Sequence, residues 1–264
     1  MINIISLGVG VQSVTLFLMA CHNELKPRPK CAVFADPKWE RYQTYATLGW
    51  LQTLGDIYGI PIFVVSDGNI RTDILDHSTR SLSPPLFIKT KDGNLSLMRR
   101  QCTLEYKIRP IQKLIKERFG ASAKNPVSTW IGISLDEMQR MKPSDRKYQV
   151  YRYPLIEKRM SRVDCYYWLH DHNYPIPVSS SCIGCPYHSP SEWRKLSNTE
   201  FQEAVDWEKS IQSTYTDNGH PFSRSFLTRY LEPLETRPFE SDHEQISFEF
   251  ETKDTLCDEG GCFL

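Results

Sequence analysis

Short apolar runs alternate with segments of helical spacing along much of the chain, and this order limits the folds open to it. Four runs have the length and composition of buried strands, and the segments between them place apolar residues on one helical face. The strand-like runs are residues 3–7, 31–35, 61–65 and 127–133, and the helical segments between them are residues 14–22, 42–58, which Gly59 ends, and 102–119, which Gly120 follows. Two further helices are predicted at residues 162–172, opened by a capping box of Ser161 and Asp164, and at residues 191–211. Because strands that alternate with helices form parallel sheets, the sequence predicts an α/β fold with helices on both faces of the sheet.

Composition and charge narrow the class of protein. The 264 residues suffice for one large domain with an appendage, which we place at residues 1–190 and 191–264. Lys plus Arg equal Asp plus Glu, 32 against 32, so the net charge indicates neither nucleic acid nor a membrane as partner. The apolar N-terminal run is too short to span a bilayer and no cationic segment precedes it. We therefore expect a cytoplasmic protein with no membrane partner and with reduced cysteines.

A glycine-bearing turn follows the first predicted strand. Gly8 and Gly10 tolerate positive φ angles and let the backbone approach a phosphate, while the next helix directs its N–H groups at the anion. Ser13 adds a hydroxyl donor. Asp36 follows the second predicted strand, where an acidic residue accepts hydrogen bonds from a ribose or adenine. The glycine-bearing turn matches neither the Walker loop nor the dinucleotide fingerprint, so an ordinary strand-to-helix turn is its alternative. For Asp36 the alternative is an ordinary Asp-Pro turn.

Cys182 and Cys185 form a Cys-x-x-Cys knuckle in which Gly184 permits the turn. This spacing lets two thiolates face one metal ion or cluster, and a redox dithiol is the alternative. Cys102 is the best candidate for a third ligand. Three thiolates favour zinc or an iron–sulfur cluster, with His188 as a further zinc ligand.

The other cysteines divide into reactive candidates and core residues. Cys102 is alternatively a reactive thiol whose pKa is lowered by Arg99 and Arg100. Cys257 and Cys262 in the acidic tail are candidates for a mobile redox or sulfur-carrying thiol or for extra metal ligands, and an inert tail is the alternative. The cysteines expected in the core are Cys21, Cys31 and Cys165.

Six segments of the chain share their order with the motifs of one known family. They are Ser6-Leu-Gly-Val-Gly-Val-Gln-Ser13, Phe34-Ala-Asp36, Cys102-Thr-Leu-Glu-Tyr-Lys107-Ile-Arg109-Pro110, Trp130-Ile-Gly132-Ile-Ser134 with Gln139-Arg140, Tyr153-Pro-Leu-Ile156 and Ser181-Cys-Ile-Gly-Cys-Pro186. Together they resemble the PAPS/APS reductase-like family of the PP-loop (adenine nucleotide alpha-hydrolase-like) superfamily, and also its DndC-like and thiolating relatives. Ser134 stands where that family has an arginine, with Arg140 as the candidate replacement, and the reductases' cysteine-bearing C-terminal motif is absent.

The resemblance implies a Rossmann-like sheet with an adenine nucleotide (ATP, APS or PAPS) at its carboxyl edge. The nucleotide-binding residues that it implies are Ser6, Gly8, Gly10, Gln12, Ser13, Asp36, Gly132, Ser134 and Arg140. It also implies a 4Fe–4S cluster on Cys102, Cys182 and Cys185, with zinc as the alternative.

The implied function is adenine-nucleotide-dependent sulfur metabolism. In sulfonucleotide reduction, Cys257 or Cys262 attacks the substrate sulfur while Arg100 and Lys107, with Arg99 and Arg109 beside them, hold sulfate and phosphate oxygens; a thiol or electron donor is then a partner. In sulfur transfer, ATP activates an acceptor, which includes thiolation or phosphorothioation of nucleic acid. A nucleotide- or zinc-binding module without catalysis is a further alternative. Nucleic-acid contact is a hypothesis for the aromatic and basic residues 146–153, for which a solvated strand edge is the other interpretation.

Overall fold

The computed structural model describes residues 1–76, 84–89, 93–215, 225–237 and 239. These residues form two compact units. Unit 1 comprises Met1–Asp67 and Glu105–Ser180, and unit 2 comprises Gly68–Leu104 and the described residues from Ser181 onwards.

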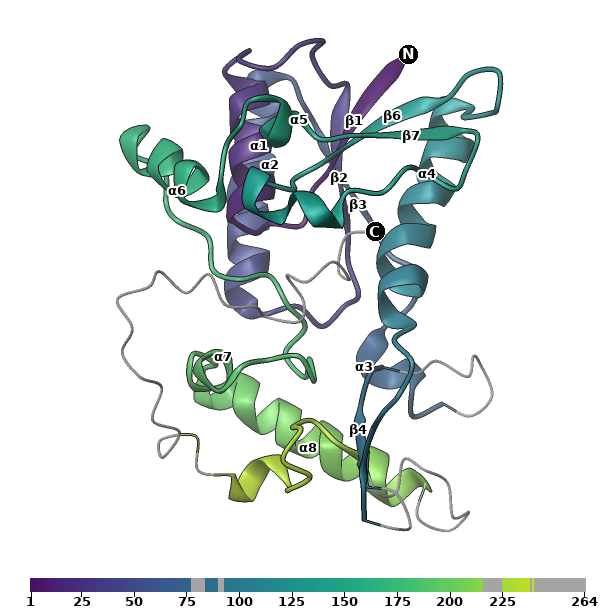
Figure 1. The fold of residues 1–264 in the computed structure, drawn as a ribbon, viewed down its shortest axis with the longest axis vertical. Coiled ribbons are helices and arrows are strands. Elements are labelled where there is room, and N and C mark those ends of the chain that lie inside the picture. Colours follow the sequence, from purple (N-terminus) through teal and green to yellow (C-terminus); the bar gives the residue numbers. More distant parts are fainter. Residues whose placement is uncertain (77–83, 90–92, 216–224, 238, 240–264) are drawn as a thin grey trace. The chain divides into compact units, whose positions relative to one another are not determined.

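Unit 1 is built on a parallel five-stranded sheet with the order β3-β2-β1-β6-β7 (Figure 1). Its strands are β1 (Ile2–Ser6), β2 (Cys31–Ala35), β3 (Ile62–Val65), β6 (Val127–Ile131) and β7 (Gln149–Arg152). β1 pairs with β2 on one side and with β6 on the other, both in parallel. The predicted parallel α/β fold is confirmed.

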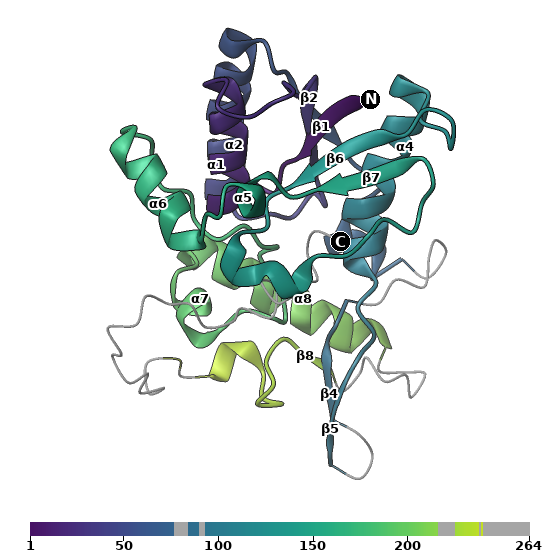
Figure 2. The same ribbon diagram turned by 45° about the horizontal axis from the view of Figure 1, so that its top comes forward.

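Helices cover both faces of this sheet because its strand residues alternate in direction. Ile5, Ala32 and Phe34 pack into one cluster with residues of α1 (Val11–Cys21), α2 (Tyr42–Tyr58) and α6 (Arg162–Asp171). On the other face, Ile4, Cys31 and Val33 pack against Ile111 and Ile115 of α4 (Arg109–Phe119). Figure 2 shows α1 and α2 on one side of β1 and α4 on the other. α1 is buried from Gln12 to Cys21, between the sheet and α6.

The strand order creates a topological switch point between β1 and β6. From β1 the chain proceeds through α1 to β2 and then β3, and it later returns to the opposite side of β1 as β6 and β7. In open α/β sheets, ligands bind where the strand order reverses, outside the carboxyl ends of the strands. The N-terminus of α1 lies at this point, since a Cβ added at Gly132 after β6 would lie 2.8 Å from the Cα of Ser13.

Local capping signals set several helix ends as predicted. Gly59 and Gly120 follow α2 and α4 in the left-handed conformation, where glycine carries no Cβ penalty. Ser161 and Asp164 form the expected capping box at the start of α6. The predicted helix 102–119 is instead a π-helical segment, Thr103–Ile108, followed by α4. Pro110 has no N–H group, so regular α-helical hydrogen bonding cannot run through it.

Unit 2 joins two distant stretches of sequence through an antiparallel sheet. β4 (Phe87–Lys89) pairs with β5 (Leu95–Leu97) and with β8 (Ser225–Phe226). Residues 68–104 therefore belong with the C-terminal region, which differs from the boundary expected at residue 190. A short helix, α3 (Ile70–Asp73), is held by Trp207, whose indole N–H donates to the Arg71 carbonyl at 2.7 Å.

The sequence predicts one helix near residues 191–211, whereas the structure has two helices there. The first is α7 (Pro190–Arg194), and the second is α8 (Asn198–Tyr215), which begins after Ser197. The Ser197 hydroxyl accepts from the Glu200 N–H, and the Glu200 carboxylate accepts from the Ser197 N–H at 2.9 Å. This capping box begins a second helix instead of continuing the first.

Glu208 of α8 organises the segment that follows this helix. Its carboxylate accepts hydrogen bonds from the Leu227 and Leu234 N–H groups, both at 2.7 Å. Burial raises the pKa of Glu208, although both backbone hydrogen bonds act to lower it. Leu234 begins a short 3-10 helix, η5 (Leu234–Thr236). None of the helices in the described part of the chain is long and apolar enough to cross a membrane.

Gly132→Ala is expected to lower the free energy of unfolding by about 1–3 kcal/mol, because the new Cβ overlaps the Ser13 backbone. Urea denaturation measures this. Gly49→Ala is the control: Gly49 lies exposed in α2 with nothing within 4 Å of an added Cβ. Alanine there is expected to raise stability by about 0.5–1 kcal/mol through its higher helix propensity. A Gly132 variant as stable as the wild type would contradict the close packing.

Candidate functional site

The turn between β1 and α1 has a strained residue at a position where the sequence predicts none. Val9 adopts φ +63°, while Gly8 and Gly10 are not among the residues with positive φ. The freedom of these two glycines to adopt positive φ is therefore not used in this turn. A β-branched residue in the left-handed region is a genuine outlier, and such strain collects at ligand-binding turns. Gly10 is instead the N-cap of α1 in an extended conformation, where an added Cβ would meet nothing within 4 Å.

The first turn of α1 offers backbone donors without a competing side chain. Gly10 provides no side-chain cap, and no acidic residue stands in the first turn. The Ser13 hydroxyl donates to the Gly10 carbonyl at 3.1 Å, and the Val14 N–H donates to that same carbonyl at 2.9 Å. The N–H groups of residues 11–13 precede the first α-helical hydrogen bond, so they suit an anion.

A polar network connects α1 to the segment that follows β6. The Gln12 amide donates to the Glu137 carboxylate at 3.1 Å and to the Ser134 hydroxyl at 3.4 Å. Glu137 also pairs with Arg140 at 2.9 Å. Arg140 is only 8% exposed, and its Nε has no hydrogen-bond partner among the described residues. Of the predicted nucleotide-binding residues, the structure thus brings together Gln12, Ser134 and Arg140, with Ser13 against Gly132.

Asp36 lies at the carboxyl end of β2, and its side chain has partners in the loop that follows and in α2. One carboxylate oxygen accepts from the Lys38 N–H at 2.7 Å and from the Tyr45 hydroxyl at 2.8 Å. The other oxygen pairs with the Lys38 ammonium at 3.2 Å. Burial is the main cause that raises the pKa of Tyr45, with Asp36 adding to it. Asp36 therefore organises this loop, and its contact with a ribose or adenine stays a prediction.

Lys107 pairs with a buried carboxylate that sequence reasoning missed. Its ammonium lies 3.0 Å from Glu40, whose side chain is fully buried. The Ser180 hydroxyl donates to the other Glu40 oxygen at 3.3 Å. Arg109 pairs with Glu105 one turn before it. Both basic side chains expected to hold anions in unit 1 thus have acidic partners.

The cysteine knuckle forms a tight turn in unit 2. The Cys185 N–H donates to the Cys182 carbonyl at 3.1 Å, and Cys102, Cys182 and Cys185 are all partly exposed thiols. His188 follows, and its ring nitrogen lies 2.8 Å from the Ser181 hydroxyl. Within the residues that the structure describes, no group of three or more His, Cys, Asp or Glu side chains is placed to hold a metal ion. The described side chains are therefore not gathered into one ligand set, and the site formed by Cys102, Cys182 and Cys185 stays a prediction.

The remaining sequence candidates have clear locations. Arg100 lies over the Tyr187 ring at 5.2 Å, and Ser6 ends β1. Cys257 and Cys262 lie outside the described residues. The core cysteines are confirmed: burial raises the pKa of each thiol to about 12, which makes them poor nucleophiles. They are Cys21, Cys31 and Cys165.

The aromatic and basic stretch 146–153 contains β7, an edge strand of the sheet. Its side chains have partners within unit 1. Arg152 lies over the Trp130 ring at 4.6 Å and pairs with Glu157 at 2.7 Å, while Lys116 lies over the Tyr148 ring at 4.4 Å. The strand-edge interpretation is therefore the one that the contacts favour.

Comparison with known proteins finds no close relative. The chain matches no protein-family model, and no curated protein matches it significantly. One of the solved structures that match is the U34-tRNA thiolase NcsA from Methanococcus maripaludis with its 4Fe–4S cluster, at 12% identity and a TM-score of 0.40. The match covers 90% of this chain and 73% of the thiolase chain. A likeness of this degree does not bear on function, so function is inferred from the residues themselves.

Sequence reasoning missed Val9, Glu40 and Glu137, and only Glu137 left a usable signal. It follows the end of β6 in Ser134-Leu-Asp-Glu137, where polar residues collect at a strand's carboxyl end. Nothing local distinguishes the buried Glu40 from a surface carboxylate.

Glu40→Gln is expected to lower the free energy of unfolding by about 3 kcal/mol, because it removes the charge partner of a largely buried lysine. Thermal and urea unfolding measure the loss. Glu235→Gln is the matched control, since its pair with Lys209 is more than half exposed on both sides, and we expect a change within about 0.5 kcal/mol. Equal effects of the two substitutions would show that the Glu40 pair is not a buried one.

Proposed function

We propose that the chain is an enzyme of the PP-loop type that binds an adenine nucleotide through unit 1 and uses it in sulfur chemistry. The observation that carries nucleotide binding is the uncapped first turn of α1 at the switch point between β1 and β6. Phosphate groups are the natural anions for such a helix start, because its N–H groups and its dipole both favour negative charge.

Three further features support a phosphate at this turn. The strain at Val9 fixes the path of the backbone into α1. Gly10 leaves open the space that a side chain would occupy. Arg140 supplies a buried positive charge beside Gln12, with its Nε still available for an acceptor. Glu137 positions both Gln12 and Arg140, so neither side chain has to be ordered when the ligand binds.

The sulfur chemistry is supported by the family resemblance and by the cysteines of unit 2. Cys102 is followed by the π-helical segment, and Cys182 and Cys185 share one turn. π-helical segments are rare and are frequent at functional sites. Sulfonucleotide reduction and ATP-dependent sulfur transfer, including thiolation of nucleic acid, are the two versions of the proposal. No step is assigned to a metal cluster.

Gly10→Ala and Arg140→Gln are each expected to weaken the binding of ATP, APS or PAPS at least about tenfold. In Gly10→Ala the new Cβ occupies the space proposed for the phosphate, and in Arg140→Gln a charge-assisted hydrogen bond to the phosphate is lost. Isothermal titration calorimetry with each nucleotide measures the change. Gly49→Ala and Arg146→Gln make the same substitutions at exposed positions of unit 1 and should bind like the wild type.

The products distinguish the versions of the reaction. Release of sulfite with AMP or PAP indicates sulfonucleotide reduction, and pyrophosphate or AMP from ATP indicates activation of an acceptor. Cys257→Ser and Cys262→Ser should abolish sulfite release if a tail thiolate attacks the sulfur. A wild-type protein that binds none of the three nucleotides would refute the proposed function.

The ligand role of the cysteines is tested by metal content. In protein purified without oxygen we expect bound iron and sulfide that Cys102→Ser, Cys182→Ser or Cys185→Ser removes, with Cys31→Ala as a control at a buried thiol. Absorbance, iron, sulfide and zinc assays measure it. Colourless protein with stoichiometric zinc would exclude the cluster. Protein with neither iron nor zinc would exclude a metal site and indicate that Cys182 and Cys185 act as a redox dithiol.

A further inference from the structure

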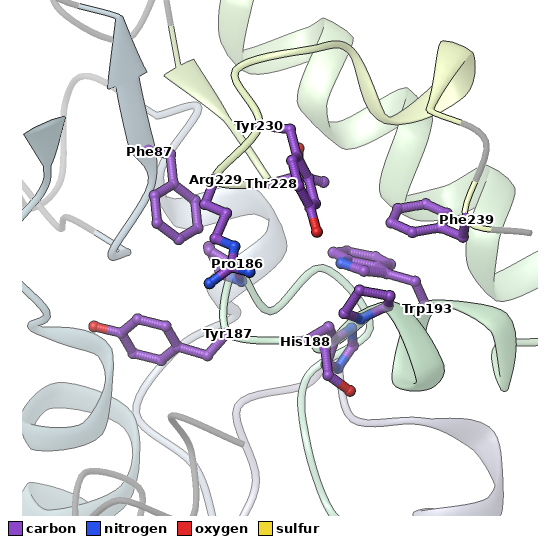
Figure 3. Close-up of a pocket in the computed structure, with 11 residues that line it drawn as sticks. Phe87, Pro186, Tyr187, His188, Trp193, Thr228, Arg229, Tyr230 and Phe239 are labelled. Carbon is purple, nitrogen blue, oxygen red and sulfur yellow. The ribbon is translucent and has the colours of Figure 1, made fainter. Parts of the chain in front are cut away.

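Unit 2 contains a cavity that the nucleotide site of unit 1 does not explain. It has a volume of about 380 Å³, within the range of small-molecule pockets. Its walls are largely aromatic: Trp193 and Phe239 lie side by side, with Tyr230 above them and Phe87 across the cavity (Figure 3). The stretch that forms one wall starts at Pro186, directly after the cysteine turn.

Contacts that the lining residues make with one another and with their neighbours hold the aromatic rings in place. Arg237 lies over the Tyr230 ring at 3.7 Å from its centroid. The His188 ring meets Trp193 edge-on at 4.6 Å, and the Ser181 hydroxyl fixes His188. Trp193 and Phe239 are stacked with centroids 6.1 Å apart. A cavity whose rings already have fixed neighbours needs little ordering to receive a ligand.

Two polar side chains give the cavity its chemical preference. Thr228 is 3% exposed and lines the cavity, and its hydroxyl has no hydrogen-bond partner among the described residues. A buried hydroxyl of this kind is costly unless a ligand satisfies it. Arg229 also lines the cavity and is exposed to solvent, so its guanidinium is accessible to an anion.

We propose that this cavity binds a nucleobase with its attached phosphate. A planar heteroaromatic ring stacks on aromatic side chains, and its edge nitrogen or oxygen atoms pair with the Thr228 hydroxyl. Arg229 pairs with the phosphate, for which a guanidinium has the matching geometry. The ligand is a free mononucleotide or one residue of a single-stranded nucleic acid. Binding in this cavity does not require the turn proposed to bind phosphate in unit 1.

Binding of AMP, GMP, CMP and UMP, and of a fluorescein-labelled single-stranded decanucleotide of mixed sequence, tests the proposal in the full chain by calorimetry and anisotropy. Tyr230→Ala is expected to weaken binding about tenfold through lost stacking. Arg229→Gln is expected to weaken it severalfold and to reduce its salt dependence by about one phosphate contact. Binding of mononucleotides identifies the free nucleotide as the source, and binding of the decanucleotide alone identifies nucleic acid.

Thr228→Val separates a ligand contact from a structural role. Replacing a buried, unpartnered hydroxyl with a methyl group should raise the melting temperature of the ligand-free protein while binding weakens severalfold. Tyr166→Ala and Lys209→Gln are matched controls: Tyr166 is 36% exposed like Tyr230, and Lys209 carries an exposed positive charge in unit 2. Both should bind like the wild type.

Two outcomes would overturn the proposal. In the first, none of the five probes binds. In the second, probes bind but Tyr230→Ala, Arg229→Gln and Thr228→Val have no effect. Repeating the titrations with Arg140→Gln distinguishes the sites: binding at the cavity persists in that variant, whereas binding that only Arg140→Gln removes belongs to unit 1.

Discussion

The backbone of Ser13 lies against Gly132, and the arrangement of unit 1 depends on this contact. A side chain at Gly132 would come within 2.8 Å of the Ser13 Cα, so only glycine lets the first turn of α1 approach the end of β6 this closely. The approach brings Gln12 within reach of Ser134 and Glu137, and Glu137 in turn holds the buried Arg140. One glycine therefore connects the packing of the sheet to the polar network at its switch point.

Much of unit 1 could be predicted because its signals are local. The bounds of α2, its C-cap at Gly59 and the capping box at Ser161 follow from residues a few positions apart. Contacts between distant residues could not be predicted. Glu40 pairs with Lys107, 67 positions further along the chain, and β4 pairs with β8 across about half of the chain. That pairing is what places residues 68–104 in unit 2.

The candidate site was predictable in its location but less so in its geometry. The order of strands and helices predicts a ligand site at the turn after β1, yet the strained residue there is Val9 and not a glycine. Asp36 and Lys107, which the family resemblance assigns to a ligand, have partners within the protein. Arg140 instead keeps an available donor. The two units thus offer different chemistry. Unit 1 has backbone and guanidinium donors of the kind that suit a phosphate. Unit 2 has an aromatic cavity, and the lining residue Pro186 directly follows the turn of Cys182 and Cys185.

The position of the phosphates is the most direct test of the proposed nucleotide site. A crystal structure of the protein with the adenine nucleotide that binds most tightly would locate them. We expect phosphate oxygens within hydrogen-bonding distance of the N–H groups of residues 11–13, with Arg140 turned toward them. A nucleotide bound elsewhere, with only solvent at the first turn of α1, would contradict it.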